Sequence, residues 1–71
     1  MARVAIIGDP VLIRGWALAG VLPLPAADAA AARAAWAALP ADVGLVVLTP
    51  HAAAALERGP DRPAVLRAVL P

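Results

Sequence analysis

The reactive side chains that most enzymes use are largely missing from this 71-residue chain. It contains no cysteine, serine, lysine, tyrosine, asparagine or glutamine. These absences remove thiolate ligands, Schiff-base amines, amide oxyanion donors and most nucleophiles. Thr49 carries the only hydroxyl group in the sequence. The composition therefore predicts a protein that is not an enzyme and that holds no cofactor.

Aromatic residues and clustered charges are also scarce. The only aromatics are Trp16 and Trp36, and six arginines face five acidic residues for a net charge of +1. Because the arginines are scattered along the chain, no basic patch is available, and we expect no nucleic-acid binding. Tryptophan either fills a core or anchors a partner. We expect Trp16 in the core, and both interpretations stay open for Trp36.

Long uninterrupted apolar runs are missing too, although 63% of the residues are hydrophobic. A membrane-spanning helix needs about 20 consecutive apolar residues, and proline or charge breaks every run here. The stretch 15–27 has the length of a signal-peptide core, but it contains two prolines and follows Asp9 in what would be the basic leader. We expect a cytoplasmic protein without direct membrane insertion.

Strand-like and helix-like segments alternate along the sequence. Asp9-Pro10 and Thr49-Pro50 each combine a helix cap with a first-turn proline, Asp28 stands near a third helix start, and Gly20 can end a helix. Runs rich in valine, isoleucine and leucine are typical of strands in a parallel sheet. The sequence predicts strands at 2–7, 21–24, 43–48 and 62–70, and helices at 10–19, 26–39 (beginning at Ala26 or Asp28) and 50–59.

This alternation predicts one α/β domain over residues 1–71. Short right-handed crossovers produce a doubly wound, four-stranded parallel sheet with strand order 2-1-3-4. Pro23 places the second strand at an edge, where a missing N–H is harmless. The run 43–48 is the most hydrophobic segment and is expected near the centre of the sheet.

Ligands of such sheets bind at the carboxyl ends of the strands, here Gly8-Asp9 and Thr49-Pro50-His51. A phosphate-binding turn is disfavoured, because the glycine spacing is wrong and an aspartate cap repels anions. A phosphoacceptor site would need a lysine and a second acid, which are missing. His51 has no carboxylate nearby in the sequence, and no metal-ligand spacing is present. We expect capped turns at these positions and a solvated His51.

An ordered set of short motifs runs along the chain. It comprises Ile7-Gly8-Asp9, Gly15-Trp16 and Leu18-Ala19-Gly20-Val21, followed by the segments 42–49 and 62–71. This set resembles the F subunit family of the V/A-type rotary ATPases, whose signature is Ile-Gly-Asp, Gly-Phe and Leu-Ala-Gly-Val. Leu12 replaces a usual threonine and Trp16 a usual phenylalanine. Family members usually continue into a C-terminal helical segment after the last strand, so the resemblance is to a short form.

The resemblance implies a non-catalytic central-stalk subunit that is peripheral to the membrane. Such a subunit binds the coiled-coil shaft subunit, contacts other rotary ATPase subunits indirectly, and helps couple ATP turnover to proton or sodium transport. We expect Asp9 and, on an exposed face of the second helix, Arg33 and Trp36 to be candidate contacts. The alternatives are a free-standing α/β interaction module and a small phosphate- or nucleotide-binding domain.

Overall fold

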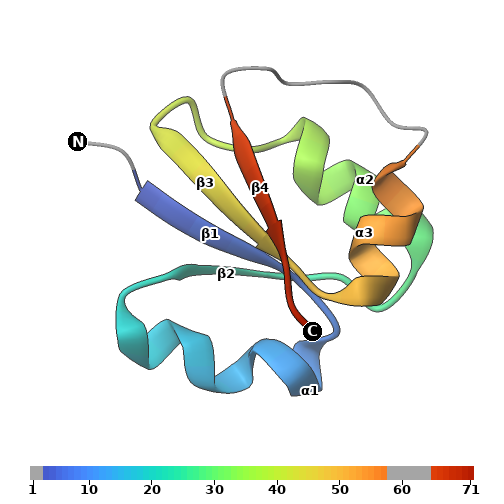
Figure 1. The fold of residues 1–71 in the computed structure, drawn as a ribbon, viewed down its shortest axis with the longest axis horizontal. Coiled ribbons are helices and arrows are strands. Elements are labelled where there is room, and N and C mark those ends of the chain that lie inside the picture. Colours follow the sequence, from blue (N-terminus) through green and yellow to red (C-terminus); the bar gives the residue numbers. More distant parts are fainter. Residues whose placement is uncertain (1–2, 58–64) are drawn as a thin grey trace.

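A four-stranded parallel sheet forms the centre of the protein in the computed structural model, which describes residues 3–57 and 65–71 (Figure 1). The strands lie in the order β2-β1-β3-β4, as the sequence predicts. Their bounds are Arg3–Gly8 for β1, Leu22–Pro25 for β2, Val43–Leu48 for β3 and Leu66–Val69 for β4. β2 is an edge strand, which confirms the placement drawn from Pro23.

The first helical segment differs from the expected single helix over 10–19. An α-helical turn, α1, covers Pro10–Ile13, and the chain then tightens into a 3₁₀-helix, η1, over Arg14–Ala19. A 3₁₀-helix rises about 2.0 Å per residue against about 1.5 Å for an α-helix, so η1 spans more distance on the way back to β2. Gly20 ends it with a φ of 82°, the left-handed conformation that glycine adopts without strain.

The strand β3 has the predicted bounds, and β1 and β2 are shifted by one residue from theirs, whereas the two later helices are shorter than the sequence predicts. α2 covers Ala29–Ala37 and α3 covers Pro50–Leu56. β4 lies within the predicted strand 62–70, of which 62–64 fall outside the described residues, as does the expected helix stop at Gly59. The last carbonyls of a helix have no partner within the helix, so its end depends on the following residues, and single-sequence patterns place such boundaries poorly.

The sheet has two faces that are covered by different helices. α2 and α3 lie side by side on one, here named the two-helix face, to which the β-strands contribute the buried residues Ala5, Ile7, Val46 and Leu48. Because side chains alternate along a strand, Ile6 points to the opposite, one-helix face. α1 contacts β1 and β2, and its Ile13 is buried with Ile6 outside the main core.

An ion pair closes the amino end of the sheet between β1 and β3. Arg3 donates from Nε to Asp42 Oδ2 at 2.6 Å and from Nη2 to Asp42 Oδ1 at 3.0 Å. This hydrogen-bonded pair lowers the pKa of Asp42 and raises the pKa of Arg3. Both side chains are about half exposed, so the pair aligns the strands and adds little stability.

Across residues 3–57 and 65–71, none of the helices combines the length and the apolar character that crossing a bilayer requires.

Candidate functional site

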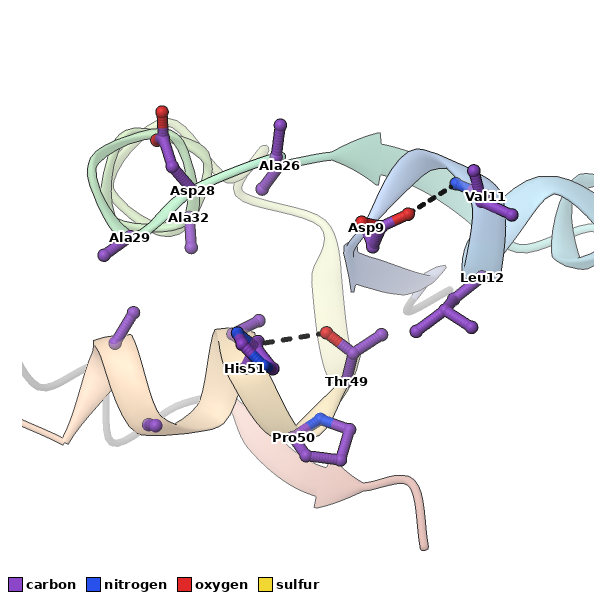
Figure 2. Close-up of a pocket in the computed structure, with 14 residues that line it drawn as sticks. Asp9, Val11, Leu12, Ala26, Asp28, Ala29, Ala32, Thr49, Pro50 and His51 are labelled. Carbon is purple, nitrogen blue, oxygen red and sulfur yellow. Dashed lines mark hydrogen bonds between the residues drawn. The ribbon is translucent and has the colours of Figure 1, made fainter.

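A groove with a volume of about 960 Å³ opens at the carboxyl end of the sheet. Its residues come from the start of α1, the segment leading into α2, and the first turns of α3, as Figure 2 shows. These elements meet there because β1 and β3 are adjacent and their following helices leave toward opposite faces. The groove therefore occupies the position at which doubly wound folds bind their ligands.

Gly8 lets β1 and β3 approach closely beside the groove. Thr49 donates its backbone N–H to the Ile7 carbonyl at 3.2 Å, and Ala26 donates to the Gly8 carbonyl at 2.7 Å. A Cβ atom on Gly8 would lie 2.6 Å from Thr49 Oγ1 and would overlap the Thr49 methyl group more severely. Glycine is required because only hydrogen fits against the buried Thr49 side chain.

Each helix that begins at the groove is capped by its own preceding residue. Asp9 accepts a hydrogen bond from the Val11 N–H at 2.8 Å, and Asp28 accepts one from the Ala31 N–H at 2.8 Å. Thr49 Oγ1 accepts from the Ala52 N–H at 3.5 Å. The sequence predicts all three caps as helix starts, and the structure brings them to one site.

Apart from Pro50 and His51, the remaining lining of the groove is aliphatic and mostly alanine. Ala26, Ala32 and Ala52 are buried, while Val11 and Leu12 are 68% and 61% exposed on the α1 side. The carboxylates of Asp9 and Asp28 are exposed, so they give the apolar groove a negative rim. His51 is exposed in the first turn of α3, as expected of a solvated residue.

This arrangement does not suit an anion or a metal ion. The helix N-termini that would attract a phosphate are already occupied by side-chain oxygens, two of them negatively charged. Among residues 3–57 and 65–71, no group of three potential metal ligands is gathered. The groove is suited instead to an apolar surface flanked by positive charge.

The motif residues separate into two sets in the structure. Asp9 lines the groove and Gly8 lies beside it, whereas Gly15, Trp16 and Leu18-Ala19-Gly20 lie along η1 and its end. Trp16 is only partly buried, so the prediction that it lies in the core is met only in part. Leu18 is 94% exposed. The second set therefore presents apolar surface away from the groove.

The prediction that Trp36 is exposed is wrong. Trp36 is 1% exposed and fills the two-helix face, with the Arg67 guanidinium carbon 4.8 Å from its ring centroid. Arg33 is exposed, and its Nη1 donates to the Ala55 carbonyl of α3 at 3.5 Å. Arg33 thus bridges α2 to α3, and Trp36 is unavailable to a partner while the fold is intact.

Sequence reasoning does not assign Val11, Leu12 and Asp28 to the site. The sequence identifies Asp28 as a helix start. Its place on the rim of the groove could have been inferred from the strand order, which places the second helix start next to Asp9. No local signal marks Leu12, because an apolar residue beside a cap is usually buried. Its exposure is a property of the tertiary structure.

No protein family, curated protein or solved structure matches this chain. The class that the fold defines is a doubly wound α/β domain with a parallel 2-1-3-4 sheet.

Proposed function

We propose that this chain is the head of a non-catalytic central-stalk subunit of a V/A-type rotary ATPase. It binds the coiled-coil shaft subunit and helps couple ATP turnover to proton or sodium transport. Support comes from the motifs that resemble the F subunit family. Gly8, Asp9 and Gly20 follow one another in this sequence in the order of the family signature, and the sheet has the topology that the resemblance implies. The proposal concerns docking, because the chain offers few groups for chemistry.

The observation that carries the proposal is the chemistry of the groove. Its helix N-termini are capped internally, its surface is methyl-rich, and its rim carries Asp9 and Asp28. A partner helix can lay an apolar stripe into such a groove, and small alanine side chains allow its backbone to come close. Lysine or arginine beside that stripe would pair with the rim. The groove is thus the docking surface for one helix of the shaft.

Leucine substitutions test the docking surface. Leu12→Glu should weaken binding of the purified shaft subunit at least tenfold, because it places a charge inside the apolar groove. Leu18→Glu is the matched control, since Leu18 is more exposed and belongs to the same segment but does not line the groove. Isothermal titration calorimetry measures both. Equal affinity of the two variants for the shaft subunit would show that the interface lies outside the groove. Failure of the wild type to bind at micromolar concentration would overturn the proposal.

Asparagine substitutions test the charge of the rim. Asn caps a helix about as well as Asp, so Asp9→Asn with Asp28→Asn preserves the fold and removes two charges. We expect weaker shaft binding with a shallower salt dependence. Asp42→Asn, at the amino end of the sheet, should leave binding unchanged. Binding of inorganic phosphate or ATP by the wild type, in place of the shaft, would support the phosphate-binding alternative instead.

A further inference from the structure

His51 is the one side chain of this sequence whose charge changes near neutral pH. The chain contains a single histidine and no cysteine. Histidine takes up its proton between about pH 8 and pH 5, whereas aspartate and glutamate titrate near about pH 4 and arginine stays charged throughout. Any pH dependence that the side chains of this protein confer near neutrality therefore comes from His51.

The structure places this histidine in the groove. His51 is exposed in the first turn of α3, and it lines the groove together with Asp9 and Asp28. Figure 2 shows it on the α3 side, with Asp28 and the start of α2 across the open space and Asp9 toward α1. Among the described residues that line the groove, these three are the only ones that can carry a charge.

The elements that pack against α3 carry few other charges. α3 contacts α2, β1 and β3. The charged groups of these elements and their caps are Asp28 and Arg33 on α2, and Arg3 and Asp9 at the two ends of β1, while β3 has none. Arg3 lies in an ion pair at the opposite end of the sheet. Arg33 donates to a carbonyl of α3, and its charge does not change with pH.

We infer that protonation of His51 weakens the docking of the shaft helix, an inference that rests on the function proposed above. With His51 neutral, the carboxylates of Asp9 and Asp28 are the charges of the groove, and they attract lysine or arginine beside the apolar stripe of the partner. A proton on His51 offsets one of these two charges. The imidazolium repels the basic side chains of the partner and competes with them for the same carboxylates. Both effects have the same sign, so the affinity should fall as the pH falls.

Docking and protonation oppose each other in both directions. A partner that binds the neutral form of His51 more tightly must also disfavour the proton, because such coupling is reciprocal. Docking near about pH 6.5, where a histidine is half protonated, should therefore release protons to the buffer. Exposed charges interact weakly, so we expect the affinity to change by about three- to fivefold. The change should become smaller as salt screens these charges.

Calorimetric titration of the full chain with the purified shaft subunit at about pH 8 and about pH 6 tests the inference. The wild type should bind about three- to fivefold more weakly at the lower pH. His51→Gln is neutral and His51→Lys is charged at both pH values, so neither should show this change. The lysine variant should bind more weakly than the glutamine variant at both. Circular dichroism checks that both variants fold, and any pH dependence that remains in His51→Gln belongs to the shaft subunit and is subtracted.

Proton release provides a second readout. Titrations near about pH 6.5 in two buffers of different ionisation enthalpy should show protons released when the wild type binds, and fewer when His51→Gln binds. Equal affinity of the wild type at the two pH values would overturn this inference and leave the docking itself in place. A pH dependence that His51→Gln retains in full would also overturn it. Failure of the wild type to bind the shaft subunit at the higher pH would overturn the proposed function and this inference together.

Discussion

Trp36 and Ile13 lie on opposite faces of the same sheet, and the two faces are covered by very different amounts of helix. On the two-helix face, Trp36, Leu39 and Leu56 form one continuous core with strand residues. On the one-helix face, α1 packs mainly against β1 and β2, and Leu66 of β4 remains 70% exposed. Parallel sheets normally need cover on both faces. The difference indicates that stability is concentrated on one face, while the other retains apolar surface.

The largest expected effect tests where stability resides. Trp36→Ala should cost about 3–5 kcal/mol, because it removes the largest buried side chain and leaves a cavity. Urea denaturation followed by circular dichroism measures this loss. Trp16→Ala is the control, since Trp16 is only partly buried on η1 and should cost clearly less. Equal losses would show that the two faces contribute equally.

A second substitution tests the boundary between β1 and β3 beside the groove. Gly8→Ala should cost about 1–3 kcal/mol, because the new methyl group overlaps the buried Thr49 side chain. Gly15→Ala meets no atom within 4 Å and should be neutral or stabilising by up to about 1 kcal/mol. Denaturant midpoints of both variants make the comparison. Destabilisation by Gly15→Ala of the same size would refute the steric explanation.

Removing the helix caps compares the stability of the two faces, because Asp28 caps α2 on one face and Asp9 caps α1 on the other. Asp28→Ala should cost about 1 kcal/mol, and Asp9→Ala less, since α1 has only four residues to lose. Asparagine at either position should restore stability, because its oxygen also accepts the N–H. A thermal unfolding series of the four variants measures this, and a failure of asparagine to rescue would contradict the capping role.

The smallest effect concerns the Arg3–Asp42 pair, which belongs to neither face. The pKa of Asp42 is lowered by the hydrogen bond from Arg3. Stabilisation from the pair is therefore present above the unfolded-state pKa of about 3.9 and is lost as pH falls through the lowered folded-state pKa. The urea midpoint measured between about pH 6 and pH 2 should fall slightly less in Asp42→Asn than in the wild type. An identical pH profile would show that the pair contributes nothing.

Much of the fold could be predicted from the sequence because its signals are local. The caps at Asp9, Asp28 and Thr49, the stop at Gly20 and the run 43–48 each act through a few neighbouring atoms. Their order then allows few topologies, since crossovers are short and right-handed. Of the candidate site, the sequence anticipated Asp9 and the segment Thr49-Pro50-His51 at the carboxyl edge of the sheet. It did not anticipate Val11, Leu12 and Asp28, because the groove depends on which residues three separate helices leave exposed.

The sequence by itself determined the alternation of elements, the helix starts, the parallel 2-1-3-4 sheet and the scarcity of reactive side chains. Only the tertiary structure decided that Trp36 is buried, that Trp16 and Leu12 are not, and that Asp28 lies beside the groove with Asp9. The physical reason is the composition of the helices. α2 is alanine on nearly every side, so no apolar stripe distinguishes its inner face. Burial is then set by contacts with distant strands, which no local pattern records.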